Sequence, residues 1–223
     1  MLSGEFQNFL FVEGLKAAGM NVLNEVVVSA ARISSTTSFE VALSYWNAFG
    51  KVPYGGARNI IYSTDAKGKY ILNEKGEKQI KYAWFNFTDK QADCVECIMA
   101  PMQNTQLFDD MSYKNGSHGR NAQVQHMIDG LKKNGYTFRK TNPKRGDLMF
   151  WTTDGTAEGA GTHVARVFKV HGENFATWGA SVSSGTPHVS GLNQLGDPYF
   201  TINDINGYRI GSGKFAGFVT LKP

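Results

Sequence analysis

The chain has 223 residues, a formal net charge of +4, and 41% hydrophobic and 19% charged residues. This composition supports a packed core and excludes wholesale disorder, and two cysteines exclude a disulfide-dense fold. The longest apolar runs are far shorter than the ~20 residues of a transmembrane helix, so no transmembrane segment is expected. The lysines are scattered rather than gathered in a stripe, which argues against nucleic acid as a partner.

The first residues do not look like a standard secretory signal, because no basic stretch precedes the apolar residues and Glu5 and Glu13 are acidic. A protein that acts outside the cytoplasm is then expected to leave by a secretion machine, by lysis or in a phage particle. The basic charge suits an anionic surface such as a cell wall. A small, polar stretch at 29–38 predicts an N-terminal extension over 1–36 and a main domain over 37–223.

The first element predicted in the main domain is a helix. Thr37 and Glu40 have capping-box spacing, apolar residues recur at helical intervals up to Phe49, and Gly50 follows where a helix should stop. From 60 to 87 the pattern changes to β-branched and aromatic runs separated by turns rich in Gly and Asp, which predicts hairpins.

A second long helix is predicted from Asn121, with one apolar face and Asn134–Gly135 at its end. The remainder predicts short strands, at 147–151, 162–170, 174–178, 198–202, 208–211 and 215–221. Helices followed by antiparallel strands indicate an α+β fold, with the helices packed on one face of a curved antiparallel sheet.

Cys94 is the first candidate for chemistry. It follows Asp93, a candidate N-cap, and Glu96 completes capping-box spacing in a short helix that Pro101 should end. The positive end of the helix dipole favours a thiolate, as a nucleophile requires. Three other interpretations remain open: a buried apolar thiol, a redox-active or bridging pair with Cys97, and part of a zinc site with His118 and His126, whose spacing is unusual for zinc.

His163 is the second candidate. It stands at the start of a predicted strand, where its ring can lie at the sheet edge and act as a base toward a helix-borne thiol. Along this strand His163, Ala165 and Val167 alternate with Val164, Arg166 and Phe168, so the two sets should face opposite sides.

Four blocks of sequence occur in the order typical of one enzyme family. They are Pro53-Tyr54-Gly55-Gly56, Asp93-Cys94-Val95-Glu96-Cys97-Ile98, Arg145-Gly146-Asp147-Leu148-Met149-Phe150 and His163-Val164-Ala165-Arg166-Val167. As an ordered set they resemble the NlpC/P60 family of cell-wall cysteine peptidases, within the papain-like group that includes CHAP amidases. The resemblance runs from about Val41 to Val219.

The resemblance implies a papain-like fold, with Cys94 as the nucleophile and His163 as the base. It also implies that Asp93 and Tyr54 line the site that receives the free amine of the peptide, although Asp93 is equally well explained as a helix cap. It implies neither a metal nor a cofactor.

The sequence departs from the family in several places. Val95 and Glu96 replace a small Ser-Gly pair, which should put bulk and charge near the cleft, and the stretch from Gly56 to Asp93 is long, as if a hairpin were inserted. The family's third polar residue has no clear counterpart. Asn174, Thr177 or a backbone carbonyl are the candidates to orient the imidazole.

The leading hypothesis is a cysteine amidase or endopeptidase that cleaves peptidoglycan stem peptides. It would be an injected antibacterial effector, with a secretion-apparatus component and an immunity protein as partners, or a phage lytic protein. In either case it would act in the cell wall or periplasm of the target cell. The alternatives are a deamidase, transglutaminase or acyltransferase toxin of the same fold, and a non-catalytic binding or structural module with an inert Cys94.

Overall fold

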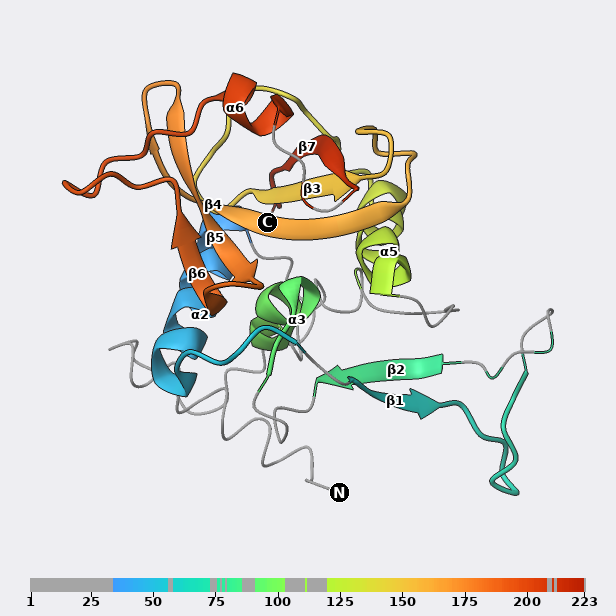
Figure 1. Cartoon of the computed structure of the whole chain (residues 1–223). Helices are drawn as coiled ribbons and strands as arrows, with labels where there is room; N and C mark the ends of the chain where they lie inside the picture. Colours follow the sequence, from blue (N-terminus) through green and yellow to red (C-terminus); the bar gives the residue numbers. More distant parts are fainter. Residues whose placement is uncertain are drawn as a thin grey trace.

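The computed structural model describes residues 34–55, 58–72, 76, 78, 80–85, 91–102, 111, 120–207, 210 and 212–222, so nearly all of the expected N-terminal extension lies outside the described residues. Its centre is an antiparallel sheet of five strands in the order β6–β5–β4–β3–β7 (Figure 1). The strands are β3 (Leu148–Thr152), β4 (Gly161–His171), β5 (Asn174–Ser181), β6 (Gly185–Ser190) and β7 (Lys214–Val219). The expected α+β class with an antiparallel sheet is confirmed.

The sheet has a hydrophobic layer on each face, and its inner strand β3 is therefore buried throughout. Leu148 and Phe150 belong to one apolar cluster, and Met149 and Trp151 belong to the other. The first cluster includes residues of three helices, α2 (Ser35–Phe49), α3 (Cys94–Met99) and α5 (Arg120–Lys133). The second includes Ile205 of α6 (Ile202–Gly207), which lies across the sheet from α3 (Figure 1). The expectation of helices on one face is therefore right for three helices and wrong for α6.

Helix α2 begins before the predicted start. Ser34, rather than Thr37, is the N-cap, and its hydroxyl accepts a hydrogen bond from the Thr37 N–H at 3.2 Å. Ser35 then donates its N–H to the Leu221 carbonyl at 3.0 Å, which ties the start of α2 to the end of the described chain. Gly50, at a φ of 94°, ends the helix as expected.

The predicted hairpin is present as a separate two-stranded antiparallel sheet. It consists of β1 (Arg58–Tyr62) and β2 (Ile80–Phe85). The segments that enter and leave it meet at an isolated bridge between Tyr54 and Ala92. The two ends of the long stretch between the two motif blocks therefore lie side by side.

Two predictions about the C-terminal strands fail. Residues 198–202 do not form a strand, because Ile202 begins α6. Thr201 and Asp204 form reciprocal hydrogen bonds at the start of this helix. The Thr201 N–H donates to Asp204 Oδ2 at 2.8 Å, and the Asp204 N–H donates to Thr201 Oγ1 at 3.2 Å. The strand β6 is not anticipated by the sequence. Of the strand expected at 208–211, only Ile210 lies among the described residues, in an isolated bridge with Gly213.

Helix α5 fixes the start of β4. Its predicted apolar face is buried against the sheet, and the Gly161 N–H donates to Gln125 Oε1 at 2.8 Å. A Cβ atom at Gly161 would lie 2.7 Å from the Gln125 backbone nitrogen, so only glycine allows this approach. His163 lies two residues further along β4, so this contact fixes the start of the strand that carries it.

None of the described helices is long and apolar enough to cross a membrane.

Candidate active site

Cys94 is the first residue of α3, and its position depends on a complete capping box. Asp93 Oδ1 accepts the N–H groups of Val95 at 2.8 Å and Glu96 at 3.0 Å, and Glu96 Oε2 accepts the Asp93 N–H at 2.9 Å. Pro101 follows in a 3₁₀ turn, Ala100–Met102, so the helix stops where the sequence predicts. The cap is confirmed, and it places the Cys94 thiol at the positive end of the helix.

Tyr54 lies beside this helix start. The Gly55 N–H donates to the Ala92 carbonyl at 3.2 Å, and the Ala92 N–H donates to the Pro53 carbonyl at 3.1 Å. These bonds place Tyr54 next to the residue that precedes Asp93. Two of the motif blocks are thus held together by backbone hydrogen bonds.

His163 approaches the same helix start from the sheet. It lies on β4 opposite Trp151, with ring centroids 5.4 Å apart, and α3 packs against β4. Burial lowers the pKa of His163 from 6.5 to about 4, and the negative charge of Asp93 opposes this shift. The charge of the residue before Cys94 therefore acts on the imidazole, which is neutral near pH 7.

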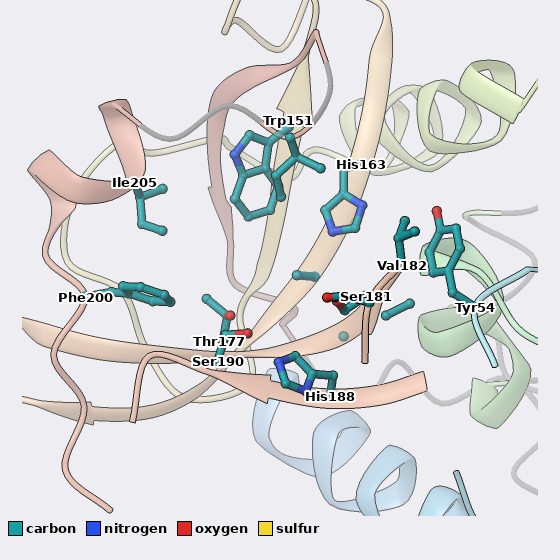
Figure 2. Close-up of a pocket in the computed structure, with 15 residues that line it drawn as sticks. Tyr54, Trp151, His163, Thr177, Ser181, Val182, His188, Ser190, Phe200 and Ile205 are labelled. Atoms are coloured by element: carbon teal, nitrogen blue, oxygen red, sulfur yellow. The ribbon is translucent and has the colours of Figure 1, made fainter. Parts of the chain in front are cut away.

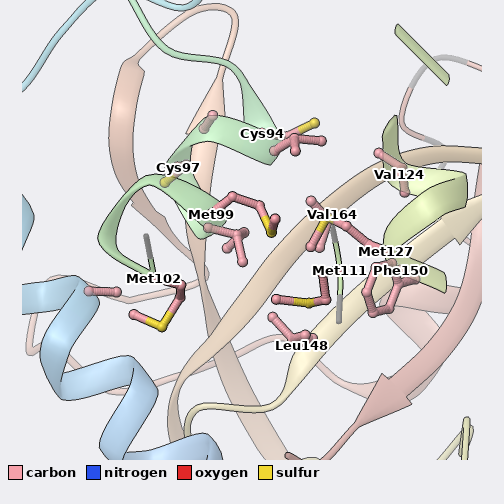
Figure 3. Close-up of a cluster of buried hydrophobic side chains, with 14 of the residues drawn as sticks. Cys94, Cys97, Met99, Met102, Met111, Val124, Met127, Leu148, Phe150 and Val164 are labelled. Carbon is pink, nitrogen blue, oxygen red and sulfur yellow. The ribbon is translucent and has the colours of Figure 1, made fainter. Parts of the chain in front are cut away.

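Tyr54 and His163 line one pocket of about 430 Å³, formed mainly over β4, β5 and β6 (Figure 2). Cys94 is not among its lining residues, and only 6% of the cysteine is exposed. Figure 3 shows the Cys94 sulfur at the edge of the buried apolar cluster. The structure thus brings Asp93, Tyr54 and His163 to the start of α3, and the thiol of its first residue, Cys94, does not line the pocket.

The two cysteines have different environments although only two residues separate them. Both are free thiols, and Cys97 is completely buried. Burial, reinforced by the nearby Cys94, raises the pKa of Cys97 well above its ordinary value, which the Arg166 charge opposes. Cys97 is therefore the inert, apolar thiol of the pair.

Glu96 points away from the pocket. The Glu96 side chain is completely buried. Burial of Tyr45 raises the pKa of that residue, and the negative charge of Glu96 adds to the increase. Val95 is also buried. The expectation that these two residues put bulk and charge near the cleft is wrong, because the capping box turns Glu96 back toward the backbone of Asp93.

The strand register separates the candidates for a third polar residue. Asn174 pairs with His171 at the far end of the β4–β5 hairpin, which places it away from His163. Thr177 pairs with Val167 and lines the pocket. Continuing the pairing beyond Arg166 and Trp178 brings Ser181 level with His163, and Figure 2 shows it beside the imidazole.

Sequence reasoning missed two polar residues of this pocket, Ser181 and His188. Ser181 carries no local signal beyond its place at the end of a strand. His188 lies on β6, opposite Gly179, in a segment for which the sequence predicts no strand. Its position depends on strand pairing, so no spacing rule within the sequence identifies it.

No cluster of metal-binding side chains occurs in the part of the chain that the structure describes. His118, one member of the zinc alternative, lies outside those residues. His126 lies on α5, where burial lowers its pKa.

The pKa of His163 predicts a pH dependence of stability. In the unfolded chain His163 takes up a proton near its ordinary pKa of 6.5, whereas in the folded chain it stays neutral down to about 4. The free energy of unfolding should therefore fall by ~3 kcal/mol from this source as the pH is lowered through that window. Urea unfolding of the wild type and of His163→Gln at pH 7 and pH 4 measures the difference, with exposed His171→Gln as the control. An unchanged pH dependence in His163→Gln would contradict the assignment.

One of the comparisons with known proteins finds a match over part of the candidate site. The model of a family described as bacteriophage peptidoglycan hydrolase matches residues 93–186. The match begins at the cap of α3 and includes Cys94 and His163, whereas Tyr54 and His188 lie outside it. No match is found among curated proteins or among solved structures. The family match supports a hydrolase that acts on peptidoglycan, without specifying the NlpC/P60 family.

Proposed function

We propose that the protein is a papain-like cysteine hydrolase of the NlpC/P60 type that cleaves amide bonds in peptidoglycan stem peptides. The observation that carries the proposal is the meeting of Asp93, Tyr54 and His163 at the start of α3. The family match over 93–186 supplies the substrate class. Its phage description favours a lytic protein over an injected effector with an immunity partner.

In this mechanism Cys94 is the nucleophile. Neutral His163 accepts the proton from the Cys94 sulfur as the thiolate attacks the carbonyl carbon, and the C–S bond forms. His163 then returns that proton to the leaving nitrogen as the C–N bond breaks. Water, deprotonated by His163, attacks the resulting thioester and releases the acid and the thiol.

The surrounding residues have supporting roles in the proposal. Asp93 holds the helix start and lowers the cost of a proton on His163 through its charge. Tyr54 lines the same pocket as His163, and in this proposal it contacts the acyl side of the peptide. No step needs a metal or a cofactor.

Digestion of purified sacculi tests the proposal. The released fragments should carry new amino and carboxyl groups in their stem peptides, and mass analysis identifies the bond that is cut. Protein alkylated with iodoacetamide should be inactive, because Cys94 is the nucleophile of this mechanism and is 6% exposed, whereas Cys97 is completely buried. New reducing sugar ends would show a glycosidase, and fragments released at the same rate by alkylated protein would exclude a thiol mechanism.

A further inference from the structure

The pocket continues beyond His163 as a groove along the sheet. Its polar side chains come from β5 and β6, and its far end is apolar, with Phe200 and Ile205 (Figure 2). Among the described residues that line it, none is Asp, Glu, Lys or Arg. The groove therefore offers hydrogen bonds without a formal charge.

Strand pairing arranges the polar groups. Thr177 lies opposite Ser190, and Gly179 lies opposite His188. Directly opposed residues of antiparallel strands share a face, so both pairs look into the groove. A Cβ atom at Gly179 would lie only 3.3 Å from the Ala165 Cβ. Because glycine has no side chain, the space beside His188 in the groove stays open.

His188 has both a donor and an acceptor to offer. Burial, and to a lesser extent the charge of Lys51, lowers the pKa of His188 from 6.5. The ring is therefore neutral near pH 7, with one N–H and one bare nitrogen. A neutral imidazole can bond an amide N–H and an amide carbonyl equally well.

The direction of the groove identifies the part of the substrate that enters it. This inference rests on the mechanism proposed above. In Figure 2, Tyr54 and α3 lie on one side of His163, whereas Thr177 and Phe200 lie on the other. His163 delivers the proton to the leaving nitrogen. The chain attached to that nitrogen should therefore run from His163 into the groove.

We propose that this groove is a binding site for an uncharged, amide-rich peptide segment on the leaving side of the scissile bond, with His188 as a specificity-determining residue. Thr177, His188 and Ser190 supply hydrogen bonds to neutral amides. A carboxylate at the same place loses water without a direct cation partner among the described lining residues, because Lys51, whose charge reaches His188, does not line the groove. Stem peptides whose leaving-side carboxyl group is amidated are therefore preferred to those with a free carboxylate.

Two synthetic peptides test the preference. They are identical except that the leaving-side residue carries either a carboxamide or a carboxylate, and the bond is the one identified from sacculi. The kcat/KM should be about tenfold higher for the carboxamide. His188→Ala should raise KM for the carboxamide peptide about fivefold with little change in kcat, because it removes a hydrogen bond made in the ground state and the transition state alike. His188→Gln should restore most of the loss, and His171→Ala, on the exposed β4–β5 turn, should have no effect.

Binding of the amine-terminated leaving fragment to Cys94→Ala, measured by calorimetry, separates this inference from the proposed function. Fragment binding that weakens with His188→Ala supports the groove even where no amide hydrolysis is found. Hydrolysis with equal kcat/KM for the two peptides, or with a KM indifferent to His188, overturns the groove and leaves the proposed function standing.

Discussion

Replacing Cys94 by alanine should lower the rate of stem-peptide hydrolysis by a factor of ~10³ or more, because the covalent step has no other nucleophile. KM should change little, since Cys94 does not line the pocket in which the proposed mechanism places the peptide. The rate of fragment release from sacculi, followed by mass analysis, measures the loss. Circular dichroism checks that the helix survives the change.

The matched control is Cys97→Ala, which removes a thiol from the same helix. Cys97 is completely buried and its pKa is raised, so its loss should cost some stability and leave the rate per folded molecule within a factor of about two. Full activity of Cys94→Ala would exclude this thiol as the nucleophile. A large rate loss in Cys97→Ala alone would transfer the role to the second cysteine.

The difference between the two cysteines shows how far local sequence signals reach. The Asp93–Glu96 spacing predicts the start of α3, and the structure confirms it because a capping box is made by residues three apart. The same pattern does not reveal that both thiols are buried, or that only Cys94 keeps some exposure, at 6%. That depends on β4 and β5, which pack against α3 from more than 60 residues away.

The strands follow a similar division. The regular alternation of β4 predicts that successive residues face opposite sides of the sheet. This is confirmed for Val164 and Ala165, which belong to the apolar clusters on the two different faces. Complete burial of Arg166 was not predictable, because it rests on a hydrogen bond to Ser38 Oγ at 2.8 Å across 128 positions. A buried cation needs distant partners, which local patterns do not show.

The pocket wall was the least predictable part of the site. Residues 185–190 include Gly185 and Pro187, which are depleted in strands, and they form β6 because β5 offers them an edge to pair with. Residues 198–202 look like a strand because of their aromatic side chains. The Thr201–Asp204 cap is a helix signal that the aromatic pattern concealed.

Asp147 belongs to one of the motif blocks, yet its contacts are structural. The carboxylate is completely buried and accepts hydrogen bonds from the Arg139 side chain, from the Lys144 N–H at 2.7 Å and from Thr220 Oγ1 at 2.7 Å. These groups come from the loop before β3 and from the residue after β7. One carboxylate therefore joins two segments that flank the central strand.

Asp147→Ala should reduce the free energy of unfolding by ~3–5 kcal/mol, because it leaves the Lys144 N–H without its acceptor and leaves the Arg139 guanidinium with only the Asn142 carbonyl as its acceptor among the described residues. The measurement is equilibrium urea unfolding. Asp197→Ala is the control: this carboxylate lies 3.8 Å from Lys169 Nζ and is 51% exposed, so its loss should cost less than ~1 kcal/mol. A loss of the same size in both variants would mean that Asp147 contributes no more than a surface ion pair, and that the β3 loop is held by its apolar contacts alone.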